Sequence, residues 1–134
     1  MASINSFEEL ECWKEAVVLR KRIRVITKSF PADEKYKLTD QLIRASRSVT
    51  ANIAEGFGRF HYLENSKFCR NSRGSLTEIL DHLILDEEEG YITMEELDEL
   101  KTETNKCIRI LNGYINYLQK AEKTKKSAPA TSNK

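Results

Sequence analysis

The sequence predicts an all-α fold: an antiparallel up-down-up-down four-helix bundle that assembles as a homo-oligomer. Three observations lead to this prediction. Apolar residues recur at spacings of three and four along most of the chain, which is the period of an amphipathic helix. Only 5 Gly and 2 Pro among 134 residues argue against an all-β fold with many turns. The stretches between the periodic segments are short, which favours antiparallel neighbours in a bundle.

The first helix is expected at about residues 7–29 and the second at about 32–56. Ser6 and Glu9 have the spacing of a capping box, which predicts a helix start. Pro31 marks a turn or the first turn of the second helix. The second helix should turn one apolar face inward, formed by Leu38, Leu42, Ala45, Val49, Ile53 and Gly56.

The third helix is expected at about residues 62–88 and the fourth at about 94–120. Gly90 should end the third helix, and Thr93 with Glu96 forms a second capping box. The inward residues of the third helix should be Phe68, Cys69, Leu76, Ile79, Leu80 and Leu83. The fourth helix has a regular seam, formed by Leu97, Leu100, Thr104, Cys107, Leu111, Tyr114 and Leu118.

The bundle is therefore expected to occupy residues 1–120 as one domain. Residues 121–134 are rich in Lys, Thr, Ser, Ala and Pro and have no apolar period. Segments of this kind cannot bury enough apolar surface to fold alone. We expect a disordered basic tail there.

A polar row runs beside the apolar face of the second helix and continues into a glycine-containing segment. A helix needs no such row in order to fold, so the row either forms a specific interface or contacts another molecule. Gly56 and Gly58 can adopt positive φ and predict a bend where the helix ends. The candidate motif and interface residues are Gln41, Arg44, Ser48, Asn52, Glu55, Gly56, Gly58 and Arg59.

The run from Gln41 to Arg59 resembles the signature of the four helix bundle protein family, also called the 23S rRNA intervening-sequence protein family. The matching pattern is Gln-Leu-x-Arg-Ala-x-x-Ser-x-x-x-Asn-Ile-Ala-Glu-Gly-x-Gly-Arg. The similarity extends over roughly Ser6 to Leu118. The chain departs from the family pattern at Asn71-Ser72, where an apolar residue followed by a small one is expected.

The resemblance implies a homo-oligomer, with a ring of five subunits as the expected form. The family also includes accessory proteins of diversity-generating retroelements, which resemble basic five-subunit bundles serving a reverse transcriptase. The resemblance therefore implies a non-enzymatic accessory or adaptor module. Its expected partners are further copies of itself and RNA or a nucleic-acid-processing protein.

Several apolar residues lie away from the expected core faces. Val18 and Val25 are seven residues apart on the first helix, and Ile110 and Tyr117 are seven apart on the fourth. Repetition at this spacing suggests a second contact surface rather than scattered exposed residues. The candidate oligomer contacts are Val18, Val25, Ile43, Ile110 and Tyr117.

Charge is unevenly distributed, although the formal net charge is only +1. Residues 14–28 hold six basic residues and one acid, whereas residues 78–103 hold 11 acids and one lysine. Basic runs can bind phosphate, but charge runs on helices are most often solvated surface. The candidate nucleic-acid contacts are Lys21, Arg22, Arg24, Lys123, Lys125 and Lys126. Arg44 and Arg59 could instead pair with Glu55 or Asn52 across an interface.

No catalytic or metal-binding pattern is present in the sequence. His61 and His82 are the only histidines, and neither has an adjacent partner with the geometry of an acid–base pair. Glu78 and His82 are four residues apart, not three as in helical di-iron bundles. We therefore expect no enzymatic activity, catalytic residue, metal, cofactor or small-molecule substrate. The alternatives are a purely structural assembly module without nucleic-acid binding and, less favoured, a small helical enzyme or metal carrier.

The sequence also predicts a cytoplasmic protein without a membrane partner. No segment approaches the roughly 20 apolar residues needed to span a bilayer, and the first residues do not resemble a signal peptide. Cys12, Cys69 and Cys107 are scattered and lie on apolar faces. This arrangement is typical of reduced core cysteines.

Overall fold

The computed structural model describes residues 4–127, which form an all-α structure with four long helices and no strand in that range. The expected all-α class with four helices is confirmed. The elements in chain order are η1 (Phe7–Glu9), α1 (Glu11–Thr27), η2 (Ala32–Glu34), α2 (Leu38–Gly58), α3 (Tyr62–Glu88) and α4 (Met94–Ser127).

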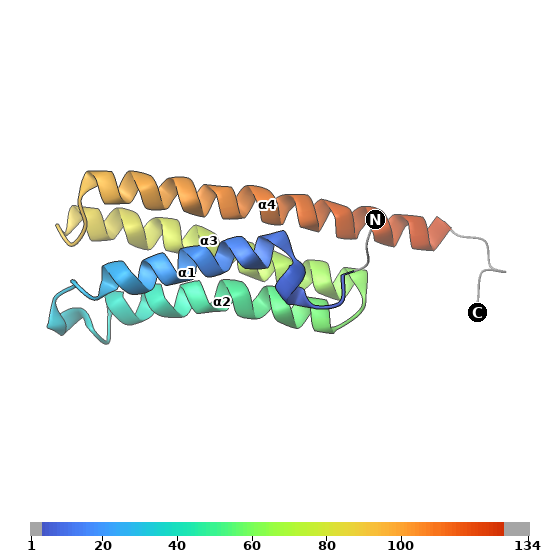
Figure 1. Cartoon of the computed structure of the whole chain (residues 1–134), viewed down its shortest axis with the longest axis horizontal. Helices are drawn as coiled ribbons and strands as arrows, with labels where there is room; N and C mark the ends of the chain where they lie inside the picture. Colours follow the sequence, from blue (N-terminus) through green and yellow to red (C-terminus); the bar gives the residue numbers. More distant parts are fainter. Residues whose placement is uncertain (1–3, 128–134) are drawn as a thin grey trace.

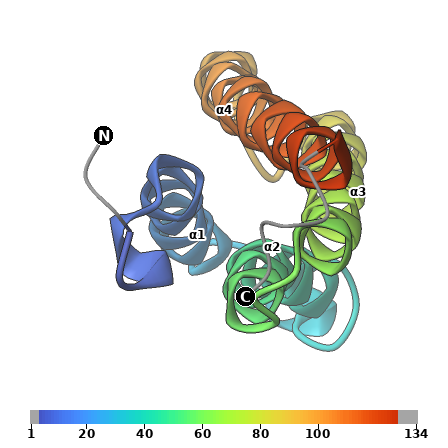
Figure 2. The same ribbon diagram turned by 90° about the vertical axis from the view of Figure 1, so that its right-hand side faces the viewer.

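The four helices lie lengthwise beside one another (Figure 1). The α1–α2 and α3–α4 connections lie at one end of the molecule, and the α2–α3 connection lies at the other. In the end view, α2 stands between α1 and α3, and α4 lies beside α3 (Figure 2). Helix α1 also contacts α4. The last turns of α4 extend past the ends of the other helices (Figure 1).

The core is formed by apolar residues that recur every three or four positions on each helix. Burying each of these side chains contributes roughly 1.5–3 kcal/mol, so the periodic faces hold the helices together. The fully buried aliphatic residues include Leu19 and Ile23 of α1, Leu42, Val49 and Ile53 of α2, Leu76, Ile79 and Leu83 of α3, and Leu100, Leu111 and Leu118 of α4.

The first expected helix is divided in two, because Leu10 is extended (φ −72°, ψ 130°). The side chain of Ser6 accepts a hydrogen bond from the Glu8 backbone amide at 3.1 Å. It therefore caps the short η1 helix and not α1. The Phe7 ring packs edge-on against Trp13, with centroids 5.2 Å apart, and this contact folds the N-terminal segment onto α1.

The second helix begins at Leu38, six residues later than expected. Residues 31–37 offer no apolar face to the core, and Tyr36 in this segment is 83% exposed. The segment is held instead by its contact with Tyr91, whose hydroxyl donates to the Glu34 carboxylate at 2.7 Å. The buried Phe30 ring lies against Tyr91 as well.

The turn between α3 and α4 follows the expected chemistry. Gly90 adopts a positive φ of 80°, and its amide donates to Glu87 while that of Tyr91 donates to the Asp86 carbonyl. This is a Schellman helix end. At the start of α4, Thr93 and Glu96 exchange the two hydrogen bonds of a capping box at 2.8 and 3.0 Å.

Helix α4 continues to Ser127, so the tail expected to be disordered from residue 121 is helical as far as residue 127. Ala, Glu and Lys are good helix formers, and Glu122 approaches Lys126 one turn later at 3.9 Å. Residues 128–134 lie outside the described range.

The buried seam of α4 differs from the expected one at a single position. Ile115 is buried, whereas Tyr114 is only half-buried. The Tyr114 hydroxyl accepts a hydrogen bond from the Asn65 side chain at 3.0 Å, and a phenol with a polar partner is best placed at the edge of a core.

Gly56 and Gly58 lie inside α2, so they do not form the expected bend. The positive φ at this exit belongs to Phe60 (φ 59°). Gly56 is required for a different reason. A Cβ there would lie 2.7 Å from the Asn65 side-chain oxygen and 3.0 Å from the Asn65 backbone oxygen, whereas at Gly58 it would meet open space.

Replacing Gly56 with alanine is expected to lower the free energy of unfolding by about 1–2 kcal/mol. Overpacking costs roughly 1–3 kcal/mol, and the better helix propensity of alanine returns at most about 1 kcal/mol. Gly58→Ala is the matched control and should raise stability by about 0.5–1 kcal/mol. Urea unfolding of both variants measures the difference. Equal shifts of the two would contradict a close α2–α3 approach at Gly56.

Candidate functional site

The polar row of α2 faces the groove between α2 and α3. Ser48 accepts hydrogen bonds from Ser75 of α3 at 3.0 Å and from the Asn52 side chain at 3.0 Å. Asn52 also donates to the Ser48 backbone carbonyl at 2.9 Å. Beside this cluster is a shallow hollow of about 310 Å³, lined by Gln41, Arg44, Ala45, Ser48, Ser75 and Glu78.

The charged members of the row make only local contacts at the protein surface. Arg59 pairs with Glu55 one turn earlier at 2.9 Å and lies 5.0 Å over the Phe68 ring of α3. Arg44 approaches Asp40, not Glu55 or Asn52, at 3.8 Å. Exposed pairs of this kind contribute at most about 1 kcal/mol. The row is thus a hydrogen-bonded α2–α3 contact at Ser48 and Asn52, with exposed charges at its ends.

The departure from the family pattern at Asn71-Ser72 is accommodated without an apolar residue. Asn71 is exposed. Ser72 is fully buried and donates to the Val49 carbonyl of α2 at 2.7 Å. The serine hydroxyl has a partner, so its burial in the helix contact is not penalised.

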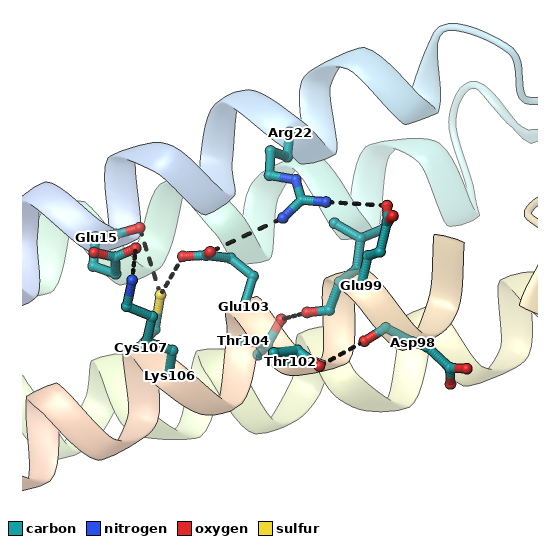
Figure 3. A network of polar contacts seen from close by, with 10 residues as sticks. Glu15, Arg22, Asp98, Glu99, Thr102, Glu103, Thr104, Lys106 and Cys107 are labelled. Carbon is teal, nitrogen blue, oxygen red and sulfur yellow. Dashed lines mark hydrogen bonds and ion pairs between the residues drawn. The ribbon is translucent and has the colours of Figure 1, made fainter. Parts of the chain in front are cut away.

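Helices α1 and α4 are joined by a network of charged groups (Figure 3). Arg22 reaches Glu99 at 3.5 Å and Glu103 at 3.9 Å, and Lys106 pairs with Glu15 at 3.3 Å. The thiol of Cys107 lies between, 3.5 Å from the Glu15 carbonyl and 3.9 Å from the Glu103 carboxylate.

Two carboxylates of this network lie close together and largely out of solvent. The side chains of Glu15 and Glu103 are 14% and 12% exposed. Burial raises the pKa of Glu103, and its hydrogen bond to Glu15 and the charge of Glu15 act in the same direction, against Lys106 and Arg22. Arg22 therefore compensates acidic groups of α4 and does not lie with Lys21 and Arg24.

The basic residues of α1 divide between two sides of the helix. Arg20 donates to Thr50 of α2 at 2.8 Å, whereas Lys21 and Arg24 are exposed. A groove of about 160 Å³ between α1 and α2 is lined by Arg20, Lys21, Arg24, Ile43, Ser46 and Arg47. Lys123, Lys125 and Lys126 lie elsewhere, exposed on the last turns of α4.

The candidate oligomer contacts fall into two groups. Val18, Val25 and Tyr117 are 44%, 65% and 50% exposed in the single chain. Ile43 is half-buried at the α1–α2 groove, and Ile110 packs partly against the core of its own chain. The last two offer less apolar surface to a second subunit than the sequence pattern suggests.

The histidines and cysteines occupy structural positions. His61 is exposed and precedes α3, and His82 contacts Glu78 one turn earlier at 3.1 Å. Cys12, Cys69 and Cys107 are free and buried, and burial raises the pKa of each thiol to about 12. Across residues 4–127, no group of three or more His, Cys, Asp or Glu side chains is arranged to hold a metal ion.

Asp86 is a buried ionisable group that the sequence analysis did not single out. Its side chain is fully buried on α3, and neither carboxyl oxygen has a hydrogen-bond partner among the described residues. Burial raises its pKa to about 6, with the nearby Glu34 adding to the shift and His82 opposing it. In the sequence, Asp86 is hidden in an acidic run, and only its helical spacing from Ile79 and Leu83 indicated an inward position.

Comparison with known proteins agrees with the motif of α2 and with the fold. The family model of the 23S rRNA-intervening sequence protein matches residues 8–113. The chain belongs to this family. The match includes α1, α2 and α3 in full and most of α4. No curated protein matches the chain.

One solved structure with the same fold is a protein of unknown function from the S23 ribosomal protein family of Bacteroides thetaiotaomicron. The TM-score is 0.72 at 19% sequence identity, and the alignment covers 78% of this family member and 95% of that chain. At this identity the likeness shows the fold alone. None of the helices within residues 4–127 is long and apolar enough to cross a membrane.

Asp86→Asn is expected to stabilise the protein above pH 6. The pKa of Asp86 is about 6 in the folded chain and about 4 in an unfolded one. The folded state therefore holds the proton more tightly, and the free energy of unfolding falls as pH rises from about 4 to 6. The asparagine variant lacks this loss, which amounts to roughly 2–3 kcal/mol at pH 7.

Urea unfolding between pH 4 and 7 tests this expectation. The stability difference between Asp86→Asn and the unaltered chain should widen between about pH 4 and 6 and then stay constant. Asp81→Asn, at an exposed position of the same helix, should show no such widening. A difference independent of pH would mean that Asp86 titrates normally.

Proposed function

We propose that this protein is a non-enzymatic adaptor that works as a homo-oligomer and associates with RNA. The proposal includes the antiparallel up-down-up-down order of the helices and, from the family resemblance, five subunits. The cytoplasm is its proposed location, in keeping with three buried, free cysteines.

The outer ridge of α1, formed by Lys14, Val18, Lys21 and Val25, is the observation that carries this proposal. These residues are spaced by four, three and four positions, so they form one stripe, and all four are exposed. The stripe points away from the buried side of α1, which is formed by Cys12, Ala16, Leu19, Ile23 and Thr27.

The composition of the outer ridge fits a second copy of the chain. Two valines one heptad apart, 44% and 65% exposed, provide apolar contact of the kind that bundles use between helices. Tyr117 of α4 adds a second exposed apolar group, stacked on Tyr114 with centroids 6.2 Å apart.

RNA is the second partner class because the basic residues of α1 exceed the acids available to pair with them. Of the basic residues in α1, only Arg22 forms an ion pair within the described part of the chain. Uncompensated Lys and Arg side chains on one surface are the electrostatic basis of nucleic-acid binding.

Substituting Val18→Glu together with Val25→Glu is expected to separate the oligomer into monomers. Both positions are exposed in the single chain, so the fold should tolerate the charges, while an interface burying them would not. Light scattering measures the mass, and circular dichroism should show unchanged helicity.

The matched control introduces two glutamates at exposed polar positions of α3, Asn71→Glu with Thr77→Glu. This variant should keep the mass of the unaltered protein. An unchanged mass in the valine variant, or a monomeric unaltered chain, would remove self-association through α1.

RNA association is tested by a mobility shift with single-stranded RNA at several salt concentrations. Binding should weaken steeply with salt, because each phosphate contact releases counterions. Undetectable binding at low salt would remove RNA from the proposal and leave the assembly role alone.

A further inference from the structure

The groove between α1 and α2 concentrates positive charge from two helices. Arg20, Lys21 and Arg24 contribute from α1, and Arg47 contributes from the middle of α2. Ile43 and Ser46 complete the lining. The groove volume of about 160 Å³ is several times the roughly 30 Å³ of a water molecule, so it has room for a small anionic group.

No acidic residue neutralises these four cations. Residues 16–32, which contain most of α1, include no Asp or Glu, and neither do residues 41–54 of α2. Within residues 4–127, none of the four takes part in an ion pair. Four like charges around one groove repel one another, and a bound anion would relieve this repulsion.

The helix dipole explains only part of the arrangement. Cations near the C-terminal end of a helix are favoured by roughly 0.3–1 kcal/mol, and Arg24 lies in the last turn of α1. Arg47, however, is in the middle of α2. Arg20 lies further from the end of α1 and is fixed toward α2 by its 2.8 Å hydrogen bond to Thr50.

We propose that this groove binds phosphate groups of an RNA backbone. Guanidinium groups suit phosphate because their planar donors match its oxygens in pairs, and the groove offers three of them with one lysine. The inference rests on the RNA association proposed above and locates it between α1 and α2, away from the lysines at the end of α4.

The first experiment compares two variants with the same loss of charge. Arg24→Gln with Arg47→Gln removes two exposed cations of the groove, and Lys123→Gln with Lys125→Gln removes two exposed cations of α4. Fluorescence anisotropy measures their binding to oligouridylate of about 20 nucleotides between roughly 50 and 200 mM salt.

The groove variant should bind at least about tenfold more weakly, with a salt dependence reduced by about 1.4, or roughly 0.7 for each lost phosphate contact to a single strand. The α4 variant should bind within about twofold of the unaltered protein. The opposite order would overturn the groove as the site while leaving RNA association intact. Light scattering of both variants should show an unchanged oligomer mass.

The second experiment uses pyrophosphate alone, which tests the groove without RNA. Pyrophosphate should raise the thermal midpoint of the unaltered protein and of the α4 variant, but not that of the groove variant, because a ligand of the folded state stabilises it. If RNA does not bind and pyrophosphate still stabilises through the groove, the RNA proposal fails and the anion site stands. If pyrophosphate stabilises all three proteins equally or none, the groove is not an anion site.

Discussion

The close approach of α2 and α3 is the constraint on which the rest of the structure depends. Ser72 donates to the Val49 carbonyl while fully buried, and Gly56 leaves no space for a side chain beside Asn65. Small residues and serine hydroxyls thus replace large aliphatic groups in this contact. With one side of α2 held in this way, its neighbouring side, which carries Ser46 and Thr50, is buried toward α1. The groove between α1 and α2 is therefore a consequence of how α2 packs on α3.

The sequence predicted the four helices because their buried faces repeat every three or four residues, and the turn at Gly90 because its capping residues are local signals. Its errors lie where tertiary contacts decide. Nothing local predicts that Leu10 is extended or that residues 31–37 stay outside α2; the second follows from the contact between Glu34 and Tyr91, which are 57 positions apart. Helix α4 was expected to end at its last apolar residue, yet helix formers prolong it to Ser127.

The candidate site was less predictable, because neighbours in sequence are about 100° apart around a helix. Arg22 was grouped with Lys21 and Arg24 as part of one basic run, but it points toward the acids of α4 (Figure 3). Arg20, which is one turn before Arg24, lies on the same side as Arg24 and is the better partner for it. Helical spacing alone would have shown this. The contribution of Arg47 required the structure, since only the packing of α2 on α1 brings it to the groove.

The division of α1 into different sides explains how a chain with a net charge of +1 can still suit a polyanion. One side is buried in the core, and another spends Arg22 on the acids of α4. The groove side and the outer ridge retain their positive charge, since neither α1 after Glu15 nor the middle of α2 supplies a carboxylate. The acidic run of residues 78–103 belongs to α3 and α4. Because charges separated by more than about 10 Å are largely screened in physiological salt, the local charge of the groove, and not the net charge, governs an approaching phosphate.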